Sequence, residues 1–439
     1  MKGVVQLLAY ATYLPAYRVE GLKGRIAASF DEDSTTMAVA AALATGRTGA
    51  PAPTLLLATS SPAYLDKTNA AAVHAALGLP RETFAADLIG TARSSMAALR
   101  QASTEGGWAL MADVRVGRPG SADEKGADGA AAFLFGEEDG IAEVLAKVSL
   151  TEEFLDRWRE PTSTVGQQWE ERFGATRYAP LVKAATTRVL EQAGLDGIDH
   201  LVVTSPNSGT RKANPGSPVG FLGSADPGFA LASALDKAAP GETILLVSAT
   251  DGCDALLLEA LPALADRRQA VPLAEQLEGG TTVPYLTYLA WRGLVERELP
   301  RRPEPDRPAG PPSARGTGWK FGFTGSRCTA CGFVHLPPLR VCRGCGAQDA
   351  MEPVRGAGLK GHVATYTVDR LAFSPSPPVV DVVVDFDGGG RCSVEVADAR
   401  PEDLEVGSPV ELTFRRLFTA GGVHNYFWKA RQTKEQAHG

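Results

Sequence analysis

The stretch AADLIGTARSSMAALRQAS, residues 85–103, carries the pattern that decides the fold. Its first residues form a β-like run that ends at Gly90, and an alanine-rich helical run begins shortly afterwards on small polar residues. Many α/β enzymes hold a nucleophile where a strand enters a helix through a tight turn, because the side chain at the turn faces the positive end of the helix dipole. The turn here offers Ala92, Arg93, Ser94 and Ser95, and no cysteine.

Outward from this stretch, apolar β-type runs alternate with alanine-rich helical runs. The expected strands are 4–14, 54–61, 84–90 and 108–114, and the expected helices are 34–46, 69–79 and 95–103. The runs 127–135 and 141–150 predict an antiparallel pair that closes the sheet. This order is typical of an α/β protein with helices covering a sheet.

A second round of the same order follows. It predicts a helix over 178–194, a strand over 200–206, a helix over 229–238, a strand over 242–250, and a glycine turn that opens a further helix over 251–261. We therefore expect two similar α/β halves, about 1–150 and 175–265. Between them, residues 152–173 predict a charged helical insertion with Trp158, Trp169 and Phe173 packed beneath its solvated face.

Composition limits the class of protein. The chain has 439 residues, 44% of them hydrophobic, which is enough for two or three domains. Its net charge of −7 provides no global basic field for nucleic acid or anionic lipid. Because no window approaches the ~20 apolar residues of a membrane span and the N-terminal residues do not resemble a signal peptide, we expect a cytoplasmic protein without membrane attachment.

The sequence SRCTACGFVHLPPLRVCRGCGA, residues 326–347, contains two C-x-x-C pairs that are ten residues apart. This spacing predicts a zinc ribbon in which Cys328, Cys331, Cys342 and Cys345 hold one structural zinc ion; two redox pairs are the less favoured interpretation. Four thiolates complete a tetrahedron and leave no position for water, so the zinc is expected to stabilise the fold and not to catalyse. His335 is interpreted as a loop residue and not as a ligand.

The rest of the C-terminal third predicts a second domain type. Residues 300–318 are rich in proline and arginine, which is typical of an extended linker. Beyond the ribbon, short β runs separated by Gly, Pro and Asp turns predict a small five-stranded barrel of the OB type. The expected domains are 1–299 for the α/β part, 300–318 for the linker, 319–349 for the ribbon and 350–439 for the barrel.

Two resemblances support this division. The segments AYATYLPAYRV (9–19), AADLIGTARSSMAAL (85–99), GADGAAAFLF (126–135) and PGETILLVSATDGCDALLLEA (240–260) resemble the thiolase superfamily, and within it the 3-hydroxy-3-methylglutaryl-CoA synthase and ketoacyl synthase III branch. That resemblance covers about residues 1–290 and implies a duplicated thiolase-like fold. The last third resembles an acyl-CoA-associated family in which a zinc ribbon precedes an OB-fold, found with thiolases as partners or fused to synthase-like chains.

The resemblance also implies which positions should be catalytic. The cysteine that holds the acyl group as a thioester is expected at Ala92, and a methyl group can neither accept nor release an acyl group. The acid/base glutamate falls on Ser60 or Ser61, the histidine on Ser205, and the asparagine on Ala225 or Asp226. We therefore assign no catalytic residue: Ser60, Ala92, Ser205 and Ala225 stand where catalytic residues would be.

Nearby residues are weak substitutes for this machinery. Ser94 and Ser95 are more typical of a first helical turn than of nucleophiles, and Cys253 is more typical of a buried packing residue. For substrate binding, the candidates are Arg93, Ser94, Arg211 and Lys212, of which the arginines and the lysine could reach a CoA phosphate or lie on the surface.

These inferences predict a thiolase-fold protein that binds acyl-CoA but has lost the usual Cys/His/Glu machinery. It would act as a scaffold or acyl-CoA-channelling partner of a catalytic thiolase or acyltransferase, as a homodimer or hetero-oligomer. One alternative is a self-sufficient acyltransferase that uses non-standard residues. Another is a nucleic-acid-binding protein, because zinc ribbons and OB-folds also bind nucleic acid, with Tyr366, Tyr426, Phe427 and Trp428 as stacking platforms. The acidic balance and the thiolase-like half argue against this alternative.

Overall fold

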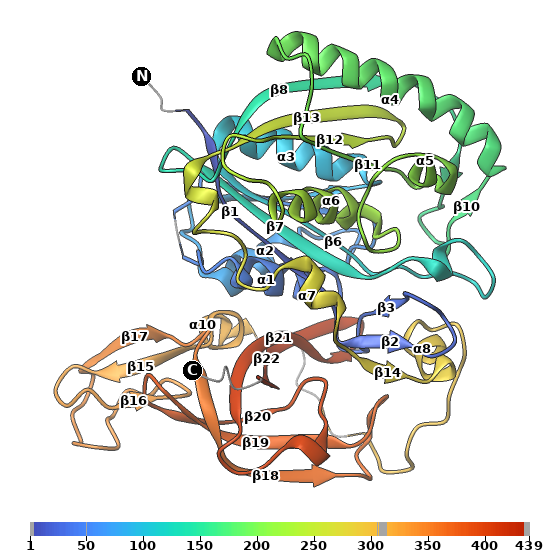
Figure 1. Cartoon of the computed structure of the whole chain (residues 1–439). Helices are drawn as coiled ribbons and strands as arrows, with labels where there is room; N and C mark the ends of the chain where they lie inside the picture. Colours follow the sequence, from blue (N-terminus) through green and yellow to red (C-terminus); the bar gives the residue numbers. More distant parts are fainter. Residues whose placement is uncertain (1–3, 50, 305, 307–313, 434–439) are drawn as a thin grey trace. The chain divides into compact units, whose positions relative to one another are not determined.

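The computed structural model describes residues 4–49, 51–304, 306 and 314–433. They form two compact units (Figure 1). The first contains most of the chain up to Leu294, and the second begins at Val295 and also takes in Ser29–Glu32 and Ala75–Gly78. Part of the predicted linker, at 305 and 307–313, lies outside the described residues.

A nine-stranded mixed sheet forms the framework of the first unit, with strand order β11-β12-β13-β8-β1-β7-β6-β4-β5. In chain order its strands are β1 (Gln6–Tyr13), β4 (Thr54–Thr59), β5 (Phe84–Ile89), β6 (Gly107–Asp113), β7 (Gly129–Gly136), β8 (Ala142–Thr151), β11 (His200–Thr204), β12 (Thr243–Ser248) and β13 (Gly252–Ala260). A smaller sheet contains β2 (Tyr17–Val19), β3 (Ile26–Ala27) and β14 (Thr281–Val283).

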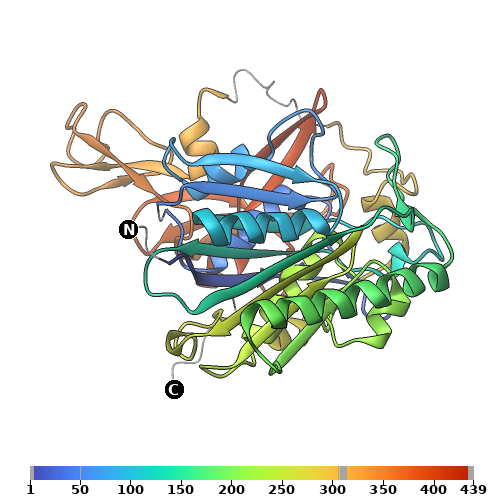
Figure 2. The same cartoon turned by 90° about the horizontal axis from the view of Figure 1, so that it is seen from above.

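Helices divide the large sheet into layers (Figure 1). Helices α3 (Arg93–Glu105) and α6 (Asp226–Leu235) lie in the middle, between the strands of the N-terminal half and those of the C-terminal half. On the outer faces, α1 (Ser34–Ala44) packs on β1, β6 and β7, and the long α4 (Glu171–Ala193) packs on β8 and β13. Figure 2 shows α4, in green, running along the strands of the second half. The remaining helices are α2 (Ala70–Leu77), α5 (Ser208–Ala213), α7 (Leu273–Leu277) and α8 (Tyr285–Trp291).

Small residues bring these layers close together. α1 and α6 are rich in alanine, and the buried helix faces exclude water from both sides of the sheet. At Gly228 in α6, a Cβ atom would lie 2.6 Å from the Cβ of Ala131 and 2.7 Å from the sulfur of Met111. A glycine is therefore required where α6 crosses β7 and β6.

The two halves repeat one order of elements. Helix, strand, helix, strand and strand appear as α1, β4, α3, β6 and β7 in the first half and as α4, β11, α6, β12 and β13 in the second. The pairings repeat as well, because β4–β6 and β11–β12 are parallel while β6–β7 and β12–β13 are antiparallel. The predicted duplicated α/β fold is confirmed.

Two local predictions are wrong. Residues 251–261 do not form a helix: Gly252–Ala260 is strand β13, the counterpart of β7, and its apolar run is buried on both sides as a central strand. Residues 152–173 are not a helical insertion either. They form the short strands β9 (Arg157–Trp158) and β10 (Gln167–Gln168), and Trp169 and Phe173 are 58% and 48% exposed instead of being packed beneath a helix.

The second unit contains a ribbon and a barrel. The ribbon sheet, with order β16-β15-β17, is formed by β15 (Thr324–Cys328), β16 (Val334–His335) and β17 (Met351–Arg355), and it follows α10 (Thr317–Gly322). The barrel strands are β18 (Lys360–Asp369), β19 (Val379–Phe386), β20 (Arg391–Glu395), β21 (Pro409–Ala420) and β22 (Val423–Gln432), with order β20-β19-β18-β21-β22. A parallel bridge between Val396 and Ala430 brings the two edges together, as expected for the predicted OB barrel.

Three residues differ in detail from expectation in this unit. His335 is buried on β16 and does not lie in a loop. Trp428 and Tyr426 are buried, and the indole Nε1 of Trp428 donates a hydrogen bond of 2.8 Å to the carbonyl oxygen of Phe321. Their rings therefore pack in the barrel interior and are not exposed for base stacking.

Candidate functional site

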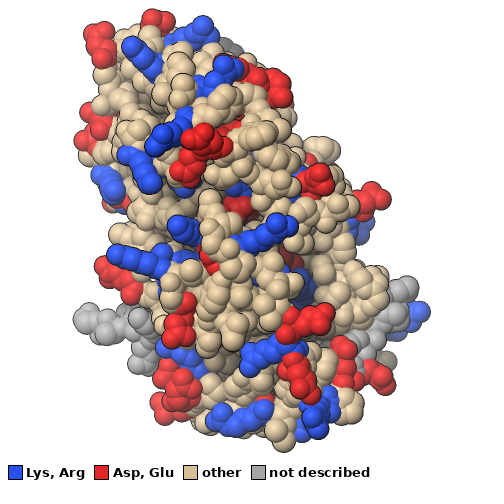
Figure 3. Space-filling model, turned by 90° about the vertical axis from the view of Figure 1, so that its right-hand side faces the viewer, with Lys and Arg blue, Asp and Glu red and all other residues tan. Residues whose placement is uncertain are grey.

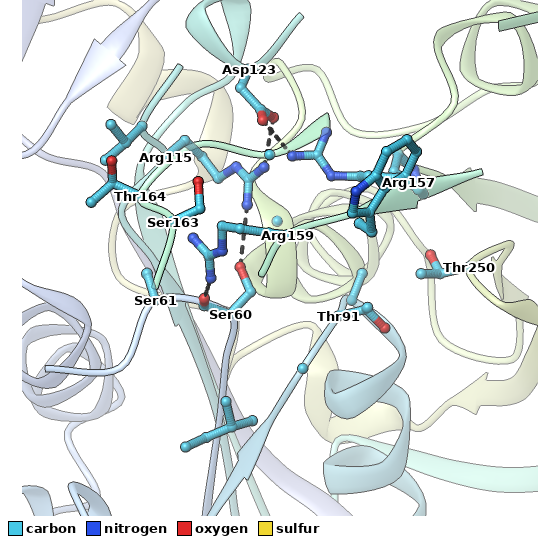
Figure 4. A pocket seen from close by; sticks show the side chains of 18 of the residues that line it. Ser60, Ser61, Thr91, Arg115, Asp123, Arg157, Arg159, Ser163, Thr164 and Thr250 are labelled. Atoms are coloured by element: carbon cyan, nitrogen blue, oxygen red, sulfur yellow. Dashed lines mark hydrogen bonds and ion pairs between the residues drawn. The ribbon is translucent and has the colours of Figure 1, made fainter. Parts of the chain in front are cut away.

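A cavity of about 650 Å³ lies in the first unit, where the ends of β4, β5, β6 and β12 converge (Figure 4). Residues from both halves line it: those that follow β4, β5 and β6 and the N-cap of α3 come from the first half, and those that follow β12 come from the second. The edge of a sheet at the carboxyl ends of its strands is a common place for ligand sites in α/β proteins. The volume is in the range of small-molecule pockets.

Ala92 lies in the lining of this cavity, at the N-cap of α3. The strand β5 ends at Ile89, and Gly90, with φ +157°, and Thr91 complete the turn into the helix. This confirms the strand-turn-helix geometry that the sequence 85–103 predicts. Among the described residues that line the cavity there is no cysteine and no histidine.

Neighbouring groups that could replace a nucleophile lie elsewhere. Ser95 is buried and its hydroxyl donates to the carbonyl oxygen of Ser224, while Ser94 is on α3 outside the lining. Cys253 is buried on β13 within the hydrophobic core, and burial raises the pKa of its thiol to about 12. A thiol with that pKa is almost entirely protonated at neutral pH and is a poor nucleophile.

Ser60 lies at the end of β4, and Asp113 at the end of β6 organises it. The Asp113 carboxylate accepts hydrogen bonds from the backbone N–H of Ser60 at 2.7 Å and from its hydroxyl at 2.6 Å. It also accepts from the N–H and hydroxyl of Ser61 and from the N–H of Ser224 at 2.6 Å. Because Asp113 is fully buried and its oxygens accept all these donors, it holds the cavity wall together.

Three arginines form the polar wall of the cavity. Arg115 donates to Ser60 Oγ at 3.2 Å and to Asp123 at 2.6 Å, and Arg157 forms an ion pair with the other oxygen of Asp123. The two guanidinium groups outweigh the effect of burial and lower the pKa of Asp123. Arg159, on the loop between β9 and β10, donates to the carbonyl oxygen of Ser60.

The sequence did not single out Asp113, Arg115, Asp123, Arg157 or Arg159. For Asp113 and Arg115 a signal existed, because Asp113 ends a buried strand and Arg115 follows it, at the same sheet edge as Ser60. Arg157 and Arg159 gave no such signal, because the charged segment 152–173 has the pattern of a solvated surface helix and its two strands are only two residues long.

Ser205 and Ala225 lie in the second half at positions equivalent to Ser60 and Ala92. Ser205 follows β11 and Ala225 is the N-cap of α6, but both are fully buried and neither lines the cavity. The next residue, Asp226, is buried, and burial raises its pKa to about 7. One of its oxygens has no hydrogen-bond partner among the described residues.

None of the four residues predicted to bind substrate, Arg93, Ser94, Arg211 and Lys212, lines the cavity. Arg93 turns to the sheet, where it pairs with Asp254 at 2.9 Å and donates to Thr151 Oγ1 at 2.8 Å. Arg211 donates to the carbonyl oxygen of Ser205 at 2.6 Å and lies over the ring of Phe221. Lys212 is exposed on α5.

The second unit brings four cysteines together. The sulfurs of Cys328, Cys331, Cys342 and Cys345 all lie within 4.8 Å of one another, with Cys328–Cys345 at 3.7 Å and Cys331–Cys342 at 3.5 Å. Sulfurs that share a tetrahedral zinc at about 2.3 Å are about 3.8 Å apart, so the cluster fits a structural zinc. The N–H of Gly344 donates to Cys342 Sγ at 3.3 Å, as expected for a zinc knuckle.

Known proteins match this part of the chain. Residues 322–352 match the rubredoxin-like zinc ribbon domain of ChsH2, and residues 354–415 match the C-terminal OB-fold domain of ChsH2. A DUF35 domain-containing scaffold protein of Methanocaldococcus jannaschii is 33% identical over 115 residues, which are 25% of this chain and 81% of that protein. The chain belongs to the DUF35 domain-containing family. A relative of the same description in Methanothermobacter thermautotrophicus is 30% identical over 86% of its length and 25% of this chain.

Ahead of its DUF35 region, the chain has a thiolase-like fold of the hydroxymethylglutaryl-CoA synthase type. The hydroxymethylglutaryl-CoA synthase of Archaeoglobus fulgidus is 27% identical over 343 residues, covering 67% of this chain and 100% of that enzyme. A crystal structure of an HMG-CoA synthase complexed with CoA matches 66% of this chain and 90% of its own with a TM-score of 0.58 and 16% identity. The structure of PksG, an HMG-CoA synthase from Bacillus subtilis, matches 67% of this DUF35 protein and 89% of its own chain with a TM-score of 0.57 and 17% identity.

Among the described residues of this DUF35 protein, no helix is both long and apolar enough to cross a lipid bilayer.

Proposed function

We propose that this protein is a non-catalytic, acyl-CoA-binding subunit that works with a catalytic thiolase or acyltransferase. The observation that carries the proposal is Ala92, which occupies the N-cap of α3 in a cavity whose described lining has no thiol or imidazole. A Claisen-type acyl transfer through the enzyme requires a nucleophile that is also a good leaving group, and a methyl group is neither. The cavity then holds an acyl group without reacting with it.

Two comparisons support the choice of ligand and role. The fold of the first unit is that of HMG-CoA synthases, one of which was crystallised with CoA. The relatives of the second unit are described as scaffold proteins. We therefore propose that the cavity binds the acyl group. The whole chain would then belong to a cytoplasmic complex in which it holds or shields the thioester for a catalytic subunit.

Neither the face shown in Figure 3 nor the net charge favours binding of nucleic acid. On the face shown in Figure 3, lysine and arginine side chains are interspersed with aspartate and glutamate and form no continuous basic field. Binding of a polyanion depends on such a field. The net charge of −7 acts in the same direction.

Intact-protein mass spectrometry after incubation with acetyl-CoA tests the absence of chemistry. We expect no acyl adduct on the peptide that contains Ala92, because Ser94 lies outside the cavity lining and the hydroxyl of Ser95 already donates to the carbonyl oxygen of Ser224. Binding should still occur and can be followed by tryptophan fluorescence, because Trp158 lines the cavity. Addition of a catalytic thiolase should raise turnover above that of either protein alone.

The control is a variant that restores a thiol, Ala92→Cys, in which an adduct shows that acetyl-CoA reaches this position. A stoichiometric adduct on Ser94, Ser95 or Cys253 of the natural chain would mean that the protein is an enzyme by itself.

A further inference from the structure

Two exposed aromatic side chains, Trp169 and Phe173, adjoin the wall of the cavity. Trp169 packs against Trp158, which lines the cavity, with ring centroids 5.8 Å apart. Phe173 contacts Phe154 at 6.4 Å, and Phe154 contacts the lining residue Tyr178 at 5.0 Å. Because Trp169 and Phe173 are 58% and 48% exposed, the aromatic wall continues onto the surface of the protein. We call these two residues the aromatic pair.

Backbone hydrogen bonds position the aromatic pair at the start of α4. The N–H of Trp169 donates to the carbonyl oxygen of Asp156 at 2.8 Å, and the N–H of Phe173 donates to the carbonyl oxygen of Glu170 at 3.1 Å. The indole N–H of Trp169 donates to no described residue. The pair therefore offers a ligand two ring faces and one hydrogen-bond donor.

The charges around the aromatic pair are mainly negative. Three acids near the pair make no ion pair among the described residues: Glu153, Glu170 and Glu171. Of the bases, Arg172 is exposed and also unpaired, while Arg177 is neutralised by Glu152. On the loop between β9 and β10, Arg159 and Glu160 carry opposite charges. Three unpaired acids against one unpaired base leave a surplus of two negative charges beside the pair.

This chemistry limits what can cover the aromatic pair. A second copy of the chain would bring the same negative surplus against it, and anionic lipid would be repelled as well. An extended segment rich in proline and arginine is complementary. Its proline rings pack on aromatic faces, its polyproline II backbone has carbonyl groups without internal hydrogen bonds, and its arginines can pair with glutamates.

We propose that the aromatic pair binds a proline- and arginine-rich segment of the catalytic partner in the polyproline II conformation. This inference rests on the proposed function, which supplies the partner, and it adds the place and the chemistry of the contact. A carbonyl oxygen of the segment accepts the indole N–H of Trp169, and its arginines face Glu170 and Glu153. Since Trp169 packs on Trp158, the bound segment holds the partner next to the cavity.

The test uses three synthetic peptides of equal length and the full chain. A peptide of Pro-Pro-Arg repeats has both the backbone and the charge that the surface requires, Pro-Pro-Glu repeats reverse the charge, and Gly-Gly-Arg repeats lose the polyproline II backbone. We expect calorimetry to show that the natural chain binds the Pro-Pro-Arg peptide about tenfold more tightly than either of the others.

Substitutions at the surface separate the contributions of the ring and of the donor. Trp169→Ala should weaken binding of the Pro-Pro-Arg peptide about tenfold, and Trp169→Phe about threefold, because phenylalanine keeps a ring face and loses the N–H. The matched control is Phe84→Ala, which removes a ring that is 62% exposed on β5 and should leave the affinity for the peptide unchanged. Binding of acetyl-CoA by each variant shows that the cavity is intact.

Equal affinity for the three peptides, or an unchanged affinity in Trp169→Ala, would overturn the inference and leave the proposed function standing, since acyl-CoA binding is measured separately. A natural chain that binds no acyl-CoA would overturn the proposed function and with it the identity of the partner. Residues 300–318 of this chain have the same proline- and arginine-rich composition. Peptide binding that appears only when they are replaced by a glycine-serine segment would make them the occupant and overturn the assignment to a partner.

Discussion

Asp128, directly before β7, links two buried arginines to the backbone of Arg115 in the cavity wall. Its carboxylate pairs with Arg25 at 3.0 Å and with Arg292 at 2.5 Å, and it accepts a hydrogen bond of 2.7 Å from the N–H of Arg115. Burial alone would raise the pKa of Asp128, but the two arginines outweigh it and lower that pKa. A buried ion pair of this kind fixes geometry more than it adds stability, and the geometry fixed here is that of the Arg115 backbone.

Asp226 has the opposite electrostatics, and it predicts a pH dependence of stability. Burial raises its pKa to about 7, against 3.8 for an exposed aspartate, so between these values the folded chain keeps a proton that the unfolded chain releases. The stabilisation is therefore complete below about pH 4 and is lost as the pH rises through 7. An asparagine at this position cannot ionise, so Asp226→Asn should not lose stability in this pH range. At pH 8 its free energy of unfolding should exceed that of the natural chain by at most roughly 4 kcal/mol.

Chemical denaturation at pH 4.5 and pH 8 measures this difference. Asp139→Asn, which changes an exposed aspartate, serves as the control and should show no pH-dependent difference. A difference between Asp226→Asn and the natural chain that is the same at both pH values would contradict the assignment.

At the scale of elements, strands and helices could be predicted where the local hydrophobic pattern fits only one type of element. The elbow at 85–103 and the alternation of strands and helices in the first half could be predicted, because each strand is an apolar run bounded by turn residues. The run 251–261 could not, because an apolar stretch of this length fits a buried strand as well as a helix and only the pairing with β8 and β12 decides. Arg157 and Arg159 could not be predicted either, because their place at the cavity depends on a hairpin whose strands, β9 and β10, have only two residues each.

The strand β5 leads to a prediction about assembly. It is the last strand of the large sheet, so one of its edges has no strand beside it among the described residues, and its ends carry Phe84 and Ile89 with 62% and 43% exposure. An exposed apolar edge favours pairing with another chain. We expect a dimer, or a hetero-oligomer with a catalytic thiolase, that forms through this edge, and Phe84→Lys should shift the isolated protein towards monomer.

Multi-angle light scattering at micromolar concentration measures the molar mass of the natural chain and of Phe84→Lys and so tests this prediction. Leu155→Lys, which places the same charge on an exposed leucine in the loop between β8 and β9, should leave the molar mass unchanged. A natural chain that is monomeric both alone and with a thiolase, or a dimer unaffected by Phe84→Lys, would exclude this edge as the interface.

At the scale of the whole molecule, the cavity and the cysteine cluster belong to different units. All residues that line the cavity lie in the first unit, whose core is formed by the large sheet with α3 and α6. The ribbon has few buried residues of its own, because its three strands are short and its hydrophobic side chains are partly exposed. Small domains of this kind depend on their metal for folding.

Loss of the metal should therefore affect the two units unequally. With Cys328→Ser, we expect loss of one bound zinc per chain and fast amide exchange over β15, β16 and β17 in hydrogen–deuterium exchange, because three thiolates do not complete the tetrahedron. Strands β1, β6 and β7 should keep their protection, because each is paired on both sides within the first unit. Cys392→Ser, which changes a cysteine of the barrel outside the cluster, should keep both the zinc and the protection. Protection lost equally in both units would mean that they fold as one cooperative body, and iron in place of zinc would contradict the metal assignment, since rubredoxin-like ribbons can hold either ion in four thiolates.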